Sequence, residues 1–169
     1  MPITRHPFLP LKPGDEWLRR FAVDEAAVTR LSTSLELIRS KGPSVTKSFY
    51  ALLFERFPGV RAMFPADIAA QERKLLDTLV MVIEHVRHPQ RVTGMLQDLG
   101  RRHVGYGARP EHYAIICSIL VECLAKEAGK DWSPQLETEW TQALALVSQI
   151  MIEAGETATA ASHRPPTSS

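Results

Sequence analysis

The chain has 169 residues, of which 44% are hydrophobic, and its 20 Lys plus Arg against 19 Asp plus Glu give a formal net charge of +1. This length and composition are typical of one domain with a buried core. The nearly balanced charge argues against a nucleic-acid partner, and two cysteines exclude a disulfide scaffold. No apolar run approaches the roughly 20 residues of a membrane span, and the N-terminus lacks the apolar region of a signal peptide. The sequence therefore predicts a soluble, cytoplasmic protein with a single folded domain.

Residues 1–25 form an N-terminal extension of that domain in this interpretation. Four prolines among the first 13 residues predict an extended conformation. Residues 15–23 then place Trp17, Leu18 and Phe21 on one side of a helix, so we expect a short additional helix there.

The folded domain is predicted to span residues 26–155, followed by a disordered tail over residues 156–169, which are mostly small and polar and include two prolines. Within the domain, apolar residues recur at helical spacing, and neither strand-like alternation nor hairpin turn pairs are present. Proline and glycine separate the helical segments. The pattern predicts an all-α fold of six or seven helices, the main ones lying at about 24–41, 43–57, 67–87, 92–103, 110–129 and from 133 onward.

The most informative position is His103, which continues the apolar stripe of Val92, Leu96 and Leu99 by one helical turn. A buried neutral imidazole needs partners for its two nitrogens. One interpretation is a core histidine bonded to a backbone carbonyl. The other is an axial ligand of haem iron or another metal.

The residues around His103 favour the second interpretation. Arg101 and Arg102 precede it and are suited to an anionic group, and Gly100 is interpreted as leaving room for a flat group to approach. A glycine-rich turn and Pro110 follow, which places the histidine near the end of its helix.

Three residues upstream add to this pattern. Gln71 and Leu75 lie one turn apart on the same helical face, and Tyr50 and Phe64 belong to an aromatic-rich helix and turn. Each also has an ordinary explanation: Gln71 as a surface residue, Tyr50 as a core residue with a satisfied hydroxyl, and Phe64 as packing.

Taken together, these segments resemble the globins, and in particular the bacterial single-domain globins related to the haem domain of flavohaemoglobins. The resemblance covers about residues 26–153. It is most specific in GRRHVGYGARPEHY, which places His103 at the position of the proximal haem ligand. FPGVRAMFP is similar to the family's interhelical corner and QERKLL to its distal helix. Trp140 matches the tryptophan of the last helix, whereas Leu35 stands where many globins have a tryptophan in the first helix.

The resemblance implies a globin fold whose helices enclose haem b, with His103 as the ligand of its iron. It also implies that Tyr50 and Gln71 are distal hydrogen-bond donors to dioxygen. The residues implied to contact the haem are Phe64, Gln71, Lys74, Leu75, Arg102, His103 and Ile116.

On the proximal side, flavohaemoglobins support the histidine with a tyrosine and a glutamate. Tyr113, ten residues after His103, matches the tyrosine. The glutamate does not match cleanly, because the expected position holds Thr157 while Glu153 and Glu156 lie nearby.

These expectations lead to a haem protein that binds dioxygen tightly, for oxygen scavenging or storage, or for nitric oxide dioxygenation. Because flavohaemoglobins use a flavin and nicotinamide reductase domain that these 169 residues do not include, turnover would need a separate reductase. The alternative is a haem-based gas sensor that signals to a partner in trans, with residues 1–25 as the surface for that partner. A third alternative is a globin fold without haem that acts as an interaction module.

Other candidate sites are weaker. His85 and His88 are three residues apart and suggest a metal site, but Pro89 favours a solvated helix end. Cys117 and Cys123 are interpreted as small core residues.

Overall fold

The computed structural model describes residues 24–41, 43–85, 88 and 90–162. Within these residues all regular structure is helical, which confirms the all-α prediction. The elements are α2 (Glu25–Ser40), α3 (Ser44–Arg56), the 3-10 turn η1 (Pro58–Met63), α4 (Ala69–Glu84), α5 (Gln90–Gly105), α6 (Pro110–Ala128), the 3-10 turn η2 (Gly129–Asp131) and α7 (Pro134–Ser162). The helix expected at 15–23 lies outside the described residues. None of the helices in the described ranges is long and apolar enough to cross a membrane.

The helix boundaries follow from local chemistry. The Asp24 carboxylate caps α2 by accepting hydrogen bonds from the backbone N–H groups of Ala26 and Ala27. Ser133 caps α7 through its hydroxyl, which accepts from the N–H of Leu136. Gly107 has φ +85°, a left-handed conformation that favours glycine, and it allows the chain to turn from the end of α5 into α6.

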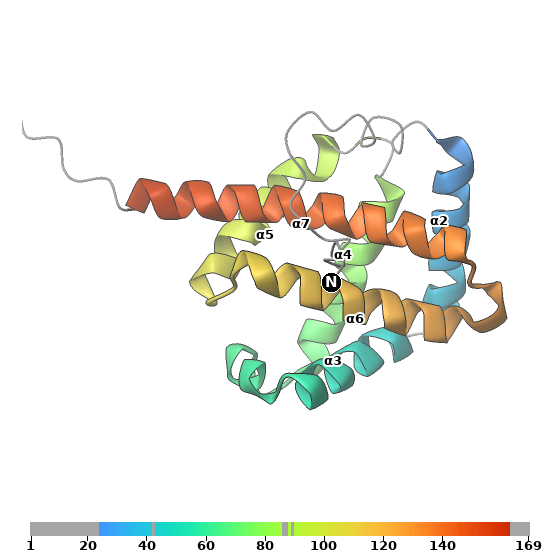
Figure 1. Ribbon diagram of the computed structural model, residues 1–169, viewed down its shortest axis with the longest axis horizontal. Helices are drawn as coiled ribbons and strands as arrows, with labels where there is room; N and C mark the ends of the chain where they lie inside the picture. The colour runs from blue at the N-terminus through green and yellow to red at the C-terminus, as the bar shows by residue number, and fades with distance from the viewer. Residues whose placement is uncertain (1–23, 42, 86–87, 89, 163–169) are drawn as a thin grey trace, which may run out of the picture.

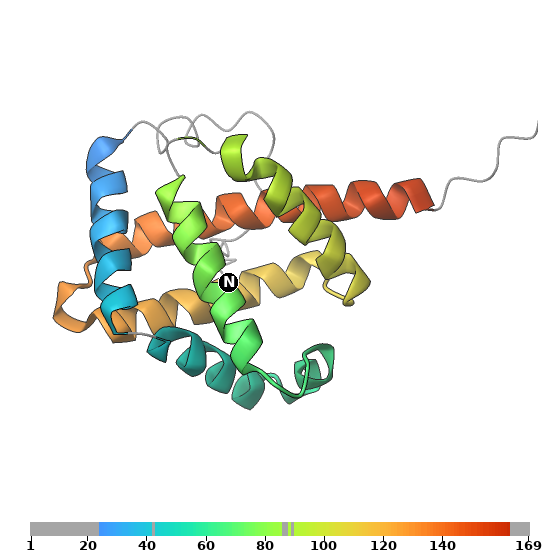
Figure 2. The same ribbon diagram turned by 180° about the vertical axis from the view of Figure 1, so that it is seen from behind.

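The helices pack in two crossing layers. α6 and α7 run alongside each other (Figure 1). Viewed from behind, α4 and α5 cross over these two helices (Figure 2). α3 packs on α4 and α6, and α2 packs on α4, α6 and α7. This arrangement places the start of α4 next to α3 and holds α5 mainly against α7.

The core lies where α2, α3, α6 and α7 meet. Trp140 is completely buried, and its indole N–H donates a 3.0 Å hydrogen bond to the Ser34 hydroxyl, so its one polar atom is satisfied. Leu35, at the position where many globins have tryptophan, is also buried in this core.

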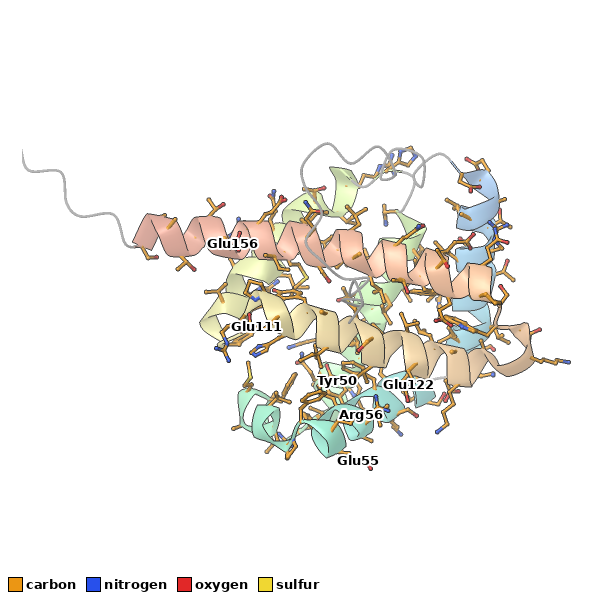
Figure 3. All side chains as sticks on the ribbon, viewed as in Figure 1. Tyr50, Glu55, Arg56, Glu111, Glu122 and Glu156 are labelled. Atoms are coloured by element: carbon orange, nitrogen blue, oxygen red, sulfur yellow. The ribbon has the colours of Figure 1, made fainter. Side chains whose placement is uncertain are left out.

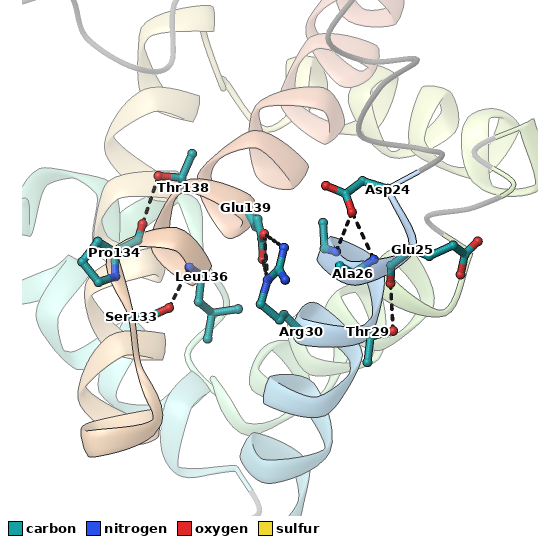
Figure 4. A network of polar contacts seen from close by, with 11 residues as sticks. Asp24, Glu25, Ala26, Thr29, Arg30, Ser133, Pro134, Leu136, Thr138 and Glu139 are labelled. Carbon is teal, nitrogen blue, oxygen red and sulfur yellow. Dashed lines mark hydrogen bonds and ion pairs between the residues drawn. The ribbon is translucent and has the colours of Figure 1, made fainter.

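α2 is also tied to α7 by an ion pair. The Arg30 guanidinium donates to both carboxylate oxygens of Glu139, with Nε–O distances of 2.9 and 3.0 Å (Figure 4). Only 7% of the Glu139 side chain is exposed, against 34% for Arg30. The carboxylate thus depends on this one guanidinium for its charge compensation.

α5 and α7 cross so closely that each helix has a glycine at the crossing point. A Cβ atom on Gly100 would lie 2.2 Å from the backbone oxygen of Met151, and one on Gly155 would lie 2.6 Å from Cγ2 of Val104. The interpretation of Gly100 as room for a flat group is therefore wrong. The glycine is required because the α7 backbone occupies the space beside it.

The disordered tail expected from residue 156 is wrong for residues 156–162, which continue α7 as a helix. This stretch is rich in alanine, the strongest helix former, and contains no proline. Its hydroxyl side chains bond within the helix, since Thr157 donates to the Glu153 carbonyl and Ser162 to the Ala158 carbonyl. Small polar residues were thus a poor indicator of disorder here. Residues 163–169 lie outside the described residues.

Candidate functional site

Tyr50 and Gln71 come together where α3 packs on α4. Tyr50 is only 4% exposed and points into the core from α3 (Figure 3). The side chain of Gln71, which is half-buried in the first turn of α4, lies close enough to the Tyr50 hydroxyl to lower its pKa. The structure therefore places side by side the two residues expected to be distal donors.

Burial raises the pKa of Tyr50 to about 12, with the Gln71 side chain acting in the opposite direction and the Glu72 carboxylate adding to the rise. The phenol therefore keeps its proton at neutral pH and remains a hydrogen-bond donor.

Aromatic rings pack against the Tyr50 ring. The rings of Tyr50 and Phe64 meet edge to face with centroids 5.6 Å apart, and Phe54 lies 5.9 Å from Tyr50 and 5.4 Å from Phe64. Arg61 fixes the position of Phe64, because its guanidinium donates to the backbone carbonyls of Phe64, Pro65 and Ala66 and stacks 5.0 Å from the Phe54 ring. The corner is thus held rigidly next to the Tyr50–Gln71 pair.

His103 occupies the last turns of α5 and is partly buried. Its Nδ1 lies 2.8 Å from the carbonyl oxygen of Leu99. Because a carbonyl can only accept, Nδ1 carries the proton and Nε2 presents a lone pair. Burial lowers the pKa of His103, and the nearby Arg102 charge acts in the same direction, against the raising effect of the Leu99 hydrogen bond. Burial and the Arg102 charge both favour the neutral imidazole, which is the form that binds metal.

Two tyrosine rings lie beside this imidazole. The Tyr113 ring centroid is 6.2 Å from that of His103, and the Tyr106 ring centroid is 6.1 Å away. Tyr106 is 61% exposed, whereas Tyr113 is partly buried, and burial raises its pKa to about 12. Tyr113 also lines a groove between α6 and the C-terminal half of α7.

The two glutamates near the proximal side differ in their surroundings. Glu156 lines the same groove as Tyr113 and lies on α7 next to Gly155, where α7 crosses α5 (Figure 3). Glu153 instead accepts a 2.8 Å hydrogen bond from the Gln149 amide along α7. The groove therefore associates Glu156, and not Glu153, with Tyr113. No hydrogen bond joins the two described side chains of Glu156 and Tyr113.

The other residues expected to contact haem lie at the surface or at the edge of the core. Leu75 and Ile116 are partly buried and pack against the core cluster. Lys74 and Arg102 are exposed, as cations that bind a solvent-facing anionic group would be. Because Arg101 is already paired with Asp98, Arg102 is the better candidate of the two for binding an anionic group.

The donor set fits haem. The imidazole of His103 is neutral and its Nε2 is not the atom that contacts Leu99, and partly buried apolar side chains that include Phe64, Leu75 and Ile116 pack against the core. These are the features that an axial haem ligand and an apolar macrocycle require.

Sequence reasoning missed three residues of this region. Phe54 lies one turn after Tyr50, and Tyr106 three residues after His103, so helical spacing alone could have indicated both. Glu72, whose side chain is buried beside Tyr50, follows no such pattern.

The weaker candidates have ordinary surroundings. Nδ1 of His85 lies 2.9 Å from the Met81 carbonyl, His88 is exposed, and the described residues contain no cluster of three or more metal-binding side chains. Cys117 and Cys123 are free and buried, as expected.

Comparison with known proteins identifies the family to which this chain is similar. The globin family model matches residues 47–151. The flavohemoprotein of Deinococcus radiodurans is 26% identical over 125 residues, covering 72% of this chain but only 31% of the relative. An uncharacterized globin-like protein of Aquifex aeolicus is 21% identical over 132 residues and is covered to 92% of its length.

A solved structure shows the same fold. An engineered carbene transferase, made from a putative nitric oxide dioxygenase of Rhodothermus marinus, aligns with a TM-score of 0.76 at 18% identity over 83% of this chain and 99% of its own. This chain spans about a third of the length of the flavohemoproteins it matches. The family match over most of the chain, together with the helical arrangement and the position of His103, leads to one conclusion: the chain belongs to the globin family, which implies haem binding.

Proposed function

We propose that this globin binds dioxygen tightly and serves either oxygen scavenging and storage or the dioxygenation of nitric oxide with electrons from a separate reductase. The observation that carries the proposal is the closeness of the Tyr50 hydroxyl and the Gln71 side chain, beside the rings of Phe54 and Phe64. The names of similar proteins, a flavohemoprotein and a putative nitric oxide dioxygenase, support it.

His103 is the residue proposed to hold the cofactor, which we take to be haem b. When bound, the haem supplies an iron atom with one coordination position open to a diatomic ligand. The Leu99 carbonyl fixes the tautomer and orientation of the imidazole so that Nε2 is the ligating atom. Lys74 and Arg102 are proposed to pair with the haem carboxylates, and Phe64, Leu75 and Ile116 to contact its apolar part.

Tyr50 and Gln71 are proposed to act on the distal side. A phenol that stays protonated and an amide present two donors to the negative charge that a polar diatomic ligand gains on binding. Such donors act more strongly in a buried site than in water, and Tyr50 is 4% exposed. At about 1–1.5 kcal/mol for each hydrogen bond and 1.4 kcal/mol for each factor of ten, the pair slows oxygen release by roughly 30- to 100-fold.

On the proximal side, Tyr113 and Glu156 are proposed to position the His103 imidazole. Tyr113 and Glu156 both line the groove that adjoins α5, whereas Glu153 does not, and this favours Glu156 for that role. A carboxylate near the imidazole makes it a better electron donor, which favours reactions of the bound ligand over simple storage.

The test is the oxygen dissociation rate of haem-loaded protein carrying Tyr50→Phe, with Tyr106→Phe as the control because the Tyr106 ring is exposed. We expect release to accelerate by about tenfold or more in the first variant and to stay unchanged in the second. Equal rates in both variants would remove the basis of the distal mechanism. A six-coordinate ferrous spectrum in the unmodified protein would favour the gas-sensor alternative.

Catalysis is tested separately by nitric oxide consumption in the oxygenated protein. A variant lacking both distal donors, Tyr50→Phe with Gln71→Leu, should consume nitric oxide more slowly than the unmodified chain. Consumption that is equally fast in both would leave oxygen storage as the proposed role.

A further inference from the structure

Glu72 and Glu139 are the two carboxylates that are buried among the described residues. Glu139 is paired with Arg30. Glu72 is 9% exposed and shares the inward-facing side of α4 with Leu79 and Ile83, yet no ion pair or side-chain hydrogen bond joins it to another residue in the described ranges. This part of the chain thus contains a buried carboxylate without a cation beside it.

Neighbouring cations do not compensate the charge of Glu72. Arg73 and Lys74, the next two residues of α4, are exposed, and Arg56 of α3 is paired with Glu122. The first turn of α4 favours a carboxylate through the helix dipole, but an exposed side chain would gain the same stabilisation. Burial of an uncompensated carboxylate costs stability, and proteins keep such features mainly at functional sites. The burial of Glu72 therefore calls for a functional explanation.

The charge of Glu72 acts on the distal hydroxyl. Among the charged groups of the described residues, Glu72 is the one with a marked effect on the pKa of Tyr50, which it raises. Gln71, the second distal residue, directly precedes Glu72 in α4. Tyr50 and Glu72 are both buried, so solvent screens the interaction little. The two distal side chains therefore lie in the field of one negative charge.

A fixed negative charge separates ligands by their own charge. At an effective dielectric constant of about 20, repulsion between two unit charges weakens binding roughly tenfold even at about 10 Å, whereas a neutral ligand is not repelled. A diatomic ligand that gains only part of a charge on binding is repelled less than a full anion. Neutral gases and small anions both accept hydrogen bonds from donors such as Tyr50 and Gln71, so the charge of Glu72 is what distinguishes them.

We propose that Glu72 is a specificity-determining residue of the distal site. Its carboxylate repels small anions such as azide, fluoride and nitrate and leaves the binding of neutral diatomic ligands almost unchanged. The inference rests on the distal role proposed for Tyr50 and Gln71. Because nitrate is the product of nitric oxide dioxygenation, the same charge keeps that product from occupying the site.

The test is the azide affinity of the ferric, haem-loaded chain carrying Glu72→Gln, which keeps the size of the side chain and removes its charge. We expect this affinity to rise roughly tenfold, also in roughly 0.5 M salt, because a buried charge is screened little. Glu72→Asp, which keeps the charge, and Asp77→Asn, which removes an exposed carboxylate from the same helix, should leave the affinity unchanged. The affinity of the ferrous form for carbon monoxide, a neutral ligand, should stay the same in all three variants.

A second readout uses the haem-free chain. The fraction of Tyr50 that ionises immediately after a jump to about pH 11 is measured from tyrosinate absorbance, with the matching Tyr50→Phe chain subtracted. Glu72→Gln should increase this fraction, because the charge that raises the pKa of Tyr50 is gone, and Asp77→Asn should not.

Four results would overturn the proposal. An unchanged azide affinity in Glu72→Gln would show that the carboxylate does not act on the ligand. A rise for azide and carbon monoxide alike would indicate a wider site instead of a charge effect. An equal rise in Asp77→Asn would assign the effect to the overall charge of the protein. Unchanged ionisation of Tyr50 in Glu72→Gln would place the carboxylate too far from the distal hydroxyl. The oxygen dissociation rate of Tyr50→Phe decides the proposed function separately from all four.

Discussion

The crossing of α5 and α7 makes Gly100→Ala the most informative single substitution. The new methyl carbon would lie 2.2 Å from the backbone oxygen of Met151 and 2.6 Å from its Cα. Since real Cβ atoms do not approach other heavy atoms closer than 3.0 Å, the two helices must separate by at least 0.8 Å. The atoms in contact belong to the α7 backbone, so no side-chain rotation relieves the overlap.

The magnitude combines two opposing effects. Overpacking of this kind costs about 3 kcal/mol or more when the backbone has to move. Alanine recovers about 1 kcal/mol because it favours the helix more than glycine does. We therefore expect Gly100→Ala to lower the free energy of unfolding by about 2 kcal/mol, which corresponds to a fall in the unfolding temperature of roughly 4–8 °C.

Gly94→Ala is the matched control on the same helix. Nothing lies within 4 Å of the Cβ position at Gly94, so this substitution should be neutral or stabilise the protein by up to about 1 kcal/mol. Both variants are compared by urea unfolding with and without haem, and by the absorption spectrum of the haem-loaded form. Because Gly100 lies three residues before His103, we also expect Gly100→Ala to weaken haem retention. Equal stability of the two variants would refute the close crossing.

Three further predictions concern charged and titratable groups. Arg30→Met leaves the buried Glu139 carboxylate without its cation and should lower the urea midpoint of unfolding by clearly more than the loss of an exposed ion pair does. Because the pKa of Tyr50 is raised to about 12 in the folded protein, the unfolded chain loses this proton first as the pH rises. The free energy of unfolding should therefore fall by up to about 2–3 kcal/mol between roughly pH 10 and 12 and be unaffected below that window. Tyr50→Phe should reduce this fall. Burial raises the pKa of Cys117 to about 11 and also raises that of Cys123, so neither thiol should react with a disulfide reagent at pH 8 until the protein is unfolded.

Controls for these predictions come from the surface. Arg56 forms an exposed pair with Glu122, so Arg56→Met should leave the urea midpoint of unfolding almost unchanged. A loss as large as that of Arg30→Met would show that burial does not decide the effect. Rapid reaction of either cysteine in the native protein would contradict its buried position.

The sequence predicted the helical elements well where proline, glycine or a capping residue marks a boundary. Asp24, Pro43 and Pro110 each lie within one residue of an observed helix start. The prediction was wrong at the end of α7, because composition was taken to indicate disorder although alanine favours continuation of a helix.

The candidate site was predictable to the extent that helical spacing determines it. The Tyr50–Gln71 contact followed from the family resemblance, and the nitrogen–carbonyl contact of His103 was one of the two interpretations considered for that residue. The role of Gly100 was not predictable from spacing. It depends on how closely α7 approaches Gly100, and that distance is set by packing against Met151, which lies 51 residues later in the sequence.

The dependence of α5 on α7 also sets an order of events during synthesis. α5 makes its most extensive helix contacts with α7, which begins 29 residues after α5 ends. α3, α4 and α6 find partners among one another earlier in translation. We therefore expect His103 to reach its final position only after α7 has been made and has docked, later than Tyr50 and Gln71, whose helices α3 and α4 pack on each other.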